Sequence, residues 1–184
     1  MSYYSIKELT TLGLKKFGSN VKISRYARIY NPGSISIGNN VRIDDFSLLS
    51  GGKAPFILED YIHIAAGVYI WGGEGFHMKS FTGLASNCKV YTKSDSYCGN
   101  YLFGPSVPEK LRKIYGMPLI IEKYSIIGAG TIILPGSIIG EGVAIGSNSL
   151  VTKECKPWNI YAGSPAKLIK ERSKKLLELE KELL

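Results

Sequence analysis

Aliphatic residues recur every six positions between Ile121 and Thr152. One of them opens each block of six, and a small or β-branched residue follows four places later. The blocks open at Ile121, Ile127, Ile133, Ile139, Ile145 and Val151, and the later residues are Ser125, Thr131, Ser137, Val143 and Ser149. An α-helix brings apolar residues round every ~3.6 positions and a single strand every ~2, so neither explains this spacing. A chain that turns a corner after each block does, and the pattern therefore predicts a β-helix.

The same period extends upstream to Ile23, with interruptions. Further blocks open at Ile29, Ile37, Ile43, Leu49, Leu58, Ile64, Ile70, Met78, Leu84 and Val90. Two extra residues, Phe76 and His77, interrupt it before Met78, and the largest break runs from Ser94 to Met117. That segment has no period and is rich in Tyr, Pro and Gly, so we expect an external loop at about 94–117.

The two ends of the chain are predicted to be helical. Apolar residues between Tyr4 and Phe17 predict a short helix that caps the first coil, because an open β-helix end is an unpaired strand edge. Ser164 and Pro165 are typical of a helix start, and an apolar stripe from Leu168 onward predicts a C-terminal helix. The predicted organisation is a capping helix in 1–20, a β-helix in 21–156, and a tail with a helix in 157–184.

Composition narrows the class of protein. The chain has 184 residues, enough for one domain with a buried core, and a formal net charge of +8. Its basic residues are scattered, so nucleic acid is not the expected partner, whereas a phosphate-bearing small molecule fits the charge. The sequence shows no signal pattern and no apolar run of about 18 residues, so we expect a cytoplasmic protein without stable membrane insertion.

The blocks of six, the external loop and the segment from Val151 to Lys167 resemble the hexapeptide-repeat acyltransferases. That segment contains Val151-Thr-Lys, Pro157-Trp158 and Ala162-Gly-Ser-Pro-Ala-Lys167. The likeness is to sugar O-acetyltransferases of the galactoside and maltose type and to surface-polysaccharide acetyltransferases. It implies an all-β, left-handed parallel β-helix, a homotrimer, and acetyl-CoA bound between adjacent subunits.

The resemblance also implies which residues bind acetyl-CoA. In this family the last coils contact the pantetheine arm largely through their backbone, and the nucleotide end lies near the final segment. The matching positions are Gly128, Ala129, Gly146, Ser147, Thr152 and Lys153, and then Pro165, Lys167 and Lys170 for the nucleotide end. Each glycine is equally expected as a corner residue of the β-helix, and the two roles are compatible.

Acetyl transfer to a sugar hydroxyl requires a base, and the chain has two histidines. His63 precedes the inward residue Ile64, so its imidazole should face outward. It resembles the histidine of the "HIAPG" segment of related sugar N-acetyltransferases, which lies at their active site. His77 is expected at a corner because it belongs to the short insertion. The alternative for each is an ordinary surface histidine.

Asp95 marks a departure from the family pattern. Galactoside-type enzymes carry their catalytic histidine in a "YTATH"-like segment that enters the external loop, and here Asp95 occupies that place. Three roles remain open for it: orienting His63 or His77, acting as a base if burial raised its pKa, or beginning the loop as a turn residue. We favour the orienting role.

Several functions compete at this point. Trp71, Tyr97 and Tyr101 could stack on a sugar ring or pack the loop. The favoured function is an acetyl-CoA-dependent O-acetyltransferase acting on a sugar hydroxyl, in surface polysaccharide biosynthesis. The alternative is an N-acetyltransferase acting on a nucleotide-linked amino-deoxy sugar, because an amine needs less help from a base. No metal site is expected, since a γ-type carbonic anhydrase on this fold needs three histidines per zinc. A non-catalytic scaffold is disfavoured by the long loop.

Overall fold

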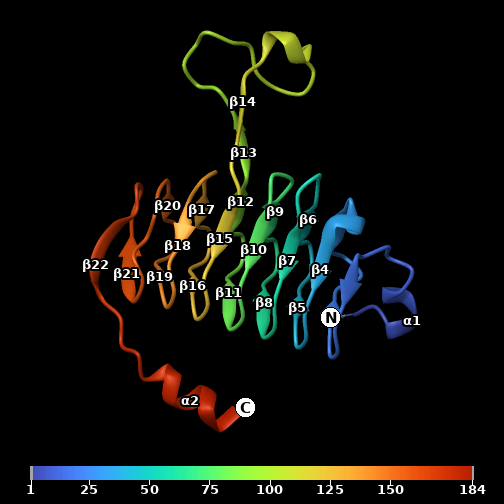
Figure 1. Ribbon diagram of the computed structural model, residues 1–184, viewed down its shortest axis with the longest axis vertical. Helices are drawn as coiled ribbons and strands as arrows, with labels where there is room; N and C mark the ends of the chain where they lie inside the picture. The colour runs from blue at the N-terminus through green and yellow to red at the C-terminus, as the bar shows by residue number, and fades with distance from the viewer. Residues whose placement is uncertain (1, 184) are drawn as a thin grey trace.

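Three parallel sheets wind around one interior, as the computed structural model of residues 2–183 shows (Figure 1). Sheet 1 contains β1 (Lys16–Phe17), β4 (Ile35–Ile37), β7 (Phe56–Leu58), β10 (Phe76–Met78), β15 (Leu119–Ile121) and β18 (Ile138–Ile139). Sheet 2 contains β2 (Lys22–Ile23), β5 (Arg42–Ile43), β8 (Ile62–Ile64), β11 (Thr82–Leu84), β16 (Ile126–Ile127), β19 (Ala144–Ile145), β21 (Asn159–Ala162) and β22 (Lys167–Glu171). Sheet 3 contains β3 (Arg28–Tyr30), β6 (Leu48–Ser50), β9 (Tyr69–Trp71), β12 (Lys89–Tyr91), β17 (Ile132–Ile133) and β20 (Leu150–Val151). Successive strands of the chain belong to successive sheets, as in a β-helix, and the hexapeptide repeats are those of the predicted left-handed form.

The residues that open the blocks of six form the core. Ile64 pairs with Ile43 and Leu84 in register, and all three are buried. The small residues four places later, such as Thr131 and Ser149, are buried as well. Fully burying one aliphatic side chain stabilises the fold by about 1.5–3 kcal/mol, so stacked columns of them account for the regular coils. The periodicity prediction is confirmed.

Corners between sheets 1 and 2 are formed by residues with left-handed backbone geometry. Aromatic side chains occupy this position in later coils, and they stack along the edge of the β-helix. The stacked residues are Tyr61, Phe81, Tyr124 and Trp158, each with φ between 56° and 63°. Residues other than Gly and Asn rarely adopt this left-handed backbone conformation, and stacking of the aromatic rings offsets part of its energetic cost.

The N-terminal helix is much shorter than predicted. Only α1 (Ile6–Leu9) is helical, with a capping box formed by Ser5 and Glu8. Residues 16–17, which we expected in the helix, instead form β1 and pair with β4. The sheet offers backbone partners there: the N–H of Gly18, directly after β1, donates to the carbonyl of Ile37 at 3.0 Å.

The external loop rises from the β-helix at the predicted place and carries its own secondary structure (Figure 1). Its base is an antiparallel hairpin of β13 (Lys93–Asp95) and β14 (Ile114–Gly116). Residues 2–183 contain two short 3-10 helices, η1 (Pro32–Ser34) at a corner and η2 (Glu109–Leu111) in this loop. The loop therefore has a fixed base rather than being structureless.

The C-terminal prediction is partly wrong. The coil continues beyond residue 156, because β21 pairs in parallel with β19. The segment after Ser164 is not a helix: β22 turns back and pairs antiparallel with β21, which covers an otherwise open sheet edge. Only α2 (Leu176–Leu183) is helical, and it lies below the β-helix in Figure 1. Neither helix among residues 2–183 is long and apolar enough to cross a membrane.

Candidate functional site

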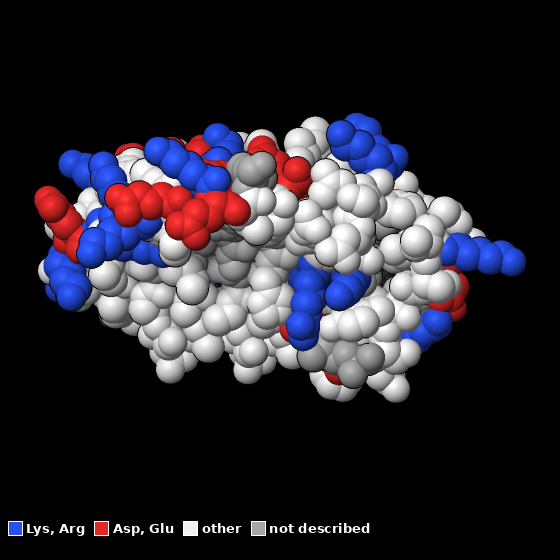
Figure 2. Space-filling view, turned by 90° about the horizontal axis from the view of Figure 1, so that it is seen from below, with Lys and Arg blue, Asp and Glu red and all other residues white. Residues whose placement is uncertain are grey.

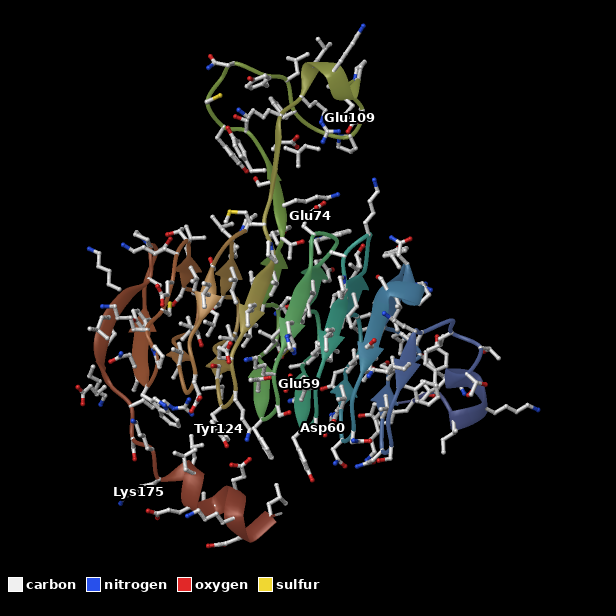
Figure 3. All side chains as sticks on the ribbon, in the orientation of Figure 1. Glu59, Asp60, Glu74, Glu109, Tyr124 and Lys175 are labelled. Atoms are coloured by element: carbon white, nitrogen blue, oxygen red, sulfur yellow. The ribbon has the colours of Figure 1, made fainter. Side chains whose placement is uncertain are left out.

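An open cleft of about 990 Å³ lies under the external loop, where the hairpin leaves sheet 3. The exposed ends of β6, β9 and β12 form one wall, and the loop forms the other. Charged residues line it from both sides: Lys53, Glu74, Lys93, Asp95, Glu109 and Arg112. Figure 3 shows Glu74 beside the base of the hairpin and Glu109 in the loop above it. Both signs of charge meet here, so the cleft suits a ligand that carries an anion and a cation.

Asp95 is held at the rim of this cleft by three donors. Its Oδ1 accepts hydrogen bonds from Arg112 Nη2 at 3.0 Å and Nε at 3.3 Å. Its Oδ2 accepts from the backbone N–H of Gly104 at 3.2 Å. These partners all belong to the loop, so the loop is folded around the Asp95 carboxylate.

The hydrogen bonds decide between the roles left open for Asp95. The backbone N–H of Gly104 has the largest effect on the pKa of Asp95 and lowers it; burial opposes this, but the hydrogen bond and charge of Arg112 add to the lowering, so the net pKa lies below its ordinary value. The alternative that burial raises the pKa of Asp95 and makes it a base is therefore wrong in this chain, because its surroundings lower that pKa. Asp95 remains a carboxylate at neutral pH and is suited to binding a cation.

His63 faces outward from β8, as predicted, and pairs with a carboxylate. Its Nε2 donates to Asp44 Oδ2 at 2.8 Å, and Arg42 Nε donates to the other oxygen at 2.7 Å. Asp44 is buried, which raises its pKa, but the hydrogen bonds from Arg42 and His63 outweigh burial and the pKa is lowered. An ionised Asp44 fixes the imidazole with Nδ1 free to accept a proton.

His77 occupies the middle of strand β10 and not a corner, so that expectation is wrong. It pairs in register with Ile57 and Ile120, because the two extra residues are absorbed in the turn before the strand. Its Nε2 donates to Glu59 Oε1 at 2.7 Å, while Ser80 donates to Glu59 Oε2. His77 thus has the same kind of carboxylate partner as His63, on a different sheet.

The predicted catalytic residues do not converge within one chain. The carboxylates that bind the imidazoles are Asp44 and Glu59, so the prediction that Asp95 orients a histidine is wrong within the chain. Sequence reasoning missed both partners, although a signal exists. Each lies one coil upstream of its histidine, 19 residues before His63 and 18 before His77. Residues separated by one coil stack side by side in a β-helix. Arg112 was missed because the loop has no period.

The three predicted substrate-binding aromatic residues lie in different surroundings. Trp71 lines the cleft together with Asp95. Tyr101 receives Lys113 Nζ over its ring at 5.6 Å, so it contributes to packing of the loop. Tyr97 is 95% exposed at the loop surface. Of the three, Trp71 is the one that the structure brings to the cleft.

The predicted cofactor residues lie at the C-terminal end of the β-helix. Gly128 and Gly146 form corners that stack directly on the next coil: a Cβ on Gly128 would lie 2.5 Å from the backbone N of Ser147. Their own N–H groups donate to Ile145 and Tyr161, so these glycines are structural corner residues. Ala129 belongs to the first of these corners, and its carbonyl accepts from the N–H of Asn148.

The other predicted cofactor residues follow the last full coil. Thr152 and Lys153 are exposed after β20, Pro165 lies in the turn that precedes β22, and Lys167 and Lys170 are exposed on β22. Lys167 and Lys170 therefore present two ammonium groups at the end of the β-helix, a donor set that fits the phosphates of a coenzyme A nucleotide.

Comparison with known proteins identifies close relatives. Residues 118–153 match the family model "Bacterial transferase hexapeptide (six repeats)". The chain is 43% identical to a dTDP-4-amino-4,6-dideoxy-D-glucose acyltransferase of Escherichia coli, over 98% of this chain and 94% of that protein.

Solved structures of AntD, an N-acyltransferase from Bacillus cereus, have nearly the same fold. One is a serine-substituted variant in complex with dTDP-4-amino-4,6-dideoxyglucose and coenzyme A, with TM-score 0.95, 46% identity, and coverage of 99% of this chain and 96% of that one. Another contains dTDP and 3-hydroxybutyryl-CoA, with TM-score 0.94, 45% identity and the same coverage. These relatives support the N-acyltransferase alternative better than the O-acetyltransferase that we favoured from the sequence. The chain belongs to the hexapeptide-repeat acyltransferase family.

Proposed function

We propose that this protein transfers an acyl group from an acyl-CoA to the 4-amino group of a dTDP-linked 4-amino-4,6-dideoxy sugar. The observation that carries the proposal is similarity over nearly the whole chain to the E. coli acyltransferase for such a sugar. The cleft under the loop supports it, because an amino sugar joined to a diphosphate carries both signs of charge. Lys53 and Lys93 suit the diphosphate, and Asp95 suits the amine.

Asp95 is the proposed contact for the acceptor amine. A carboxylate offers about four lone-pair sites, and three donors already use Asp95, so one site remains for an ammonium or amine N–H. Trp71 lies in the same cleft and is the candidate surface for stacking the sugar or the thymine ring. Tyr97 and Tyr101 are assigned to the loop surface and are not needed for this role.

His63 is the proposed base, with Asp44 as the carboxylate that orients it. We expect His63→Ala to lower kcat by about 10-fold, less than the usual general-base contribution, because an amine needs less help than a hydroxyl. His77→Ala is the matched control: it removes an imidazole with the same kind of partner, and we expect kcat to stay unchanged. Steady-state kinetics of both variants test this, and a larger loss in His77→Ala would reverse the assignment.

The acyl donor is proposed to be an acyl-CoA bound at the C-terminal coils, with Lys167 and Lys170 at its phosphates. When bound, the acyl-CoA would supply the activated thioester, and coenzyme A would leave as the free thiol. Because the AntD complex contains 3-hydroxybutyryl-CoA, we extend the expectation of acetyl-CoA to short acyl groups in general.

A homotrimer is part of the proposal. Seen from the side of α2, a broad area of the surface bears no charged side chain (Figure 2). Ile126 and Ile138 are exposed on the outer faces of the sheets, and apolar surface of this kind is typical of an interface. We expect light scattering to give about three times the 20.2 kDa chain mass, and a monomer at working concentration would contradict a site shared between subunits.

Thiol release against a panel of acceptors tests the proposed function. The panel contains plain sugars, nucleotide sugars and nucleotide amino sugars, each with acetyl-CoA and 3-hydroxybutyryl-CoA. We expect turnover with dTDP-4-amino-4,6-dideoxy sugars and none with plain sugars. Turnover confined to hydroxyl acceptors would restore the O-acetyltransferase prediction.

A further inference from the structure

The side chain of Arg112 is less exposed than that of Asp95, its ion-pair partner in the external loop. It follows η2, where its backbone N–H donates to the carbonyl of Glu109, and only 14% of its side chain is exposed. The side chain reaches across the loop to Asp95, 17 residues earlier in the sequence. Burial of a guanidinium is costly without a partner, so its nearly buried position beside Asp95 calls for a specific role.

The contacts between the two residues have an unusual distribution. Both Nε and Nη2 of Arg112 donate to Oδ1, and neither donates to Oδ2. An Arg–carboxylate pair commonly uses both oxygens in parallel. Here Oδ2 is left to the Gly104 N–H, so three donors from two sides of the loop fix the plane of the carboxylate. Three of the roughly four lone-pair sites of Asp95 are thus in use, and one remains on a residue that lines the cleft.

We propose that Arg112 is a positioning residue, which acts through Asp95 to hold the carboxylate in place for the amino group of the acceptor. The inference rests on the proposed function. It assigns acceptor recognition to a pair of residues joined across the loop, so that the folded loop and the amine-binding carboxylate form together. Arg112 itself does not contact the reacting atoms.

The surrounding charges favour the same role. Lys93 lies on the strand that carries Asp95, Lys53 and Glu74 lie on the opposite wall of the cleft, and Glu109 lies on the loop. The Gly104 N–H lowers the pKa of Asp95 most, burial opposes it, and Arg112 adds to the lowering. With the folded-state pKa below the ordinary value, Asp95 is ionised throughout the neutral range, and its ability to hold a cation is lost only as the pH falls through that lowered pKa.

The test compares Arg112→Gln, Arg112→Lys and Lys110→Gln. Arg112→Gln should raise the KM for the amino-sugar nucleotide by on the order of 10-fold or more, with the KM for acyl-CoA unchanged, because a charge-assisted contact that orders Asp95 is lost. Arg112→Lys should bind the acceptor more tightly than Arg112→Gln but less tightly than the wild type, since an ammonium keeps the positive charge but lacks the planar pair of guanidinium donors. Lys110→Gln, which removes an exposed charge from the same 3-10 helix, should leave all constants unchanged. A uniform fall in kcat with no change in the acceptor KM would overturn the proposal.

A second readout needs no substrate. Carboxyl carbon NMR should show the pKa of Asp95 rising toward the ordinary value of about 3.9 in Arg112→Gln and not in Lys110→Gln. An unchanged pKa would overturn the inference even if kinetics changed. If the wild-type protein does not acylate amino sugars while the pKa shift is found, the proposed function fails and the Arg112–Asp95 pairing stands. If Arg112→Gln does not fold, Arg112→Lys should give a smaller rise in the pKa of Asp95, because the lysine keeps the positive charge but not the two guanidinium donors.

Discussion

Asp95→Asn should lower kcat/KM for the amino-sugar nucleotide by roughly 10²–10³-fold, mainly through a higher acceptor KM. The substitution removes the negative charge that we propose binds the acceptor amine, and it leaves Arg112 without its counter-ion. The amide oxygen can still accept from Arg112 or Gly104, so the loop should fold. Because Asp95 is ionised throughout the neutral range, the loss should not vary across that range.

Glu109→Gln is the matched control for Asp95→Asn. It removes the same charge from the wall of the same cleft, with no ion pair to Glu109 among residues 2–183. Steady-state kinetics of the two variants, with thermal unfolding to check folding, test whether the effect belongs to the Asp95 carboxylate itself. Equal losses in both variants would show that the cleft acts through its overall charge and not through Asp95.

Gly38→Ala should lower the free energy of unfolding by roughly 2–4 kcal/mol, the second large effect that the structure predicts. Gly38 is the corner residue after β4, and its N–H donates to the Leu58 carbonyl of the next coil at 2.8 Å. An added Cβ would lie 2.7 Å from the backbone carbonyl of Glu59. Backbone atoms cannot move aside without breaking the ladder between coils, so the clash must strain the corner.

Gly83→Ala provides the comparison for Gly38→Ala. Gly83 lies within β11, and the atom nearest to an added Cβ is the His63 carbonyl oxygen at 3.8 Å, an ordinary contact. We expect this variant to be unchanged or more stable by about 0.5–1 kcal/mol, because alanine restricts the unfolded chain. Urea denaturation of both variants at one protein concentration is the measurement. A similar loss of unfolding free energy in both variants would mean that close stacking of the coils does not limit which residues fit at the corners.

Prediction from sequence succeeded where the chain is periodic. A period of six fixes which residues face inward, so the core and the position of the external loop followed from the aliphatic residues alone. Prediction failed at the two ends of the chain, where pairing with a neighbouring strand decides the secondary structure. Lys16 and Phe17 were assigned to a helix and form a strand, and residues 167–171 were assigned to a helix and cover the edge of β21. Helix signals depend only on the local sequence, so they do not show that a neighbouring strand offers unpaired hydrogen-bonding groups.

The candidate site was predicted only in part, because some of its residues belong to the periodic coils and others to the loop, which has no period. Asp95 and Trp71 were identified and lie in one cleft. Asp44 could have been found by counting one coil back from His63. Arg112 could not, because the contact that ties it to Asp95 depends on how a loop without a period folds. The substrate class depended on relatives and not on these residues, since neither amine nor hydroxyl is specified by the repeat.

The most direct test of the proposed function compares two acceptors that differ in one atom group. These are dTDP-4-amino-4,6-dideoxyglucose and the corresponding dTDP sugar with a hydroxyl at carbon 4, each assayed with the same acyl-CoA. The proposal predicts a kcat/KM for the amine higher by roughly 10³-fold or more, because a site built to bind the amine leaves its polar groups unpaired with the analogue. An equal or higher value for the hydroxyl compound, with an ester as product, would contradict it.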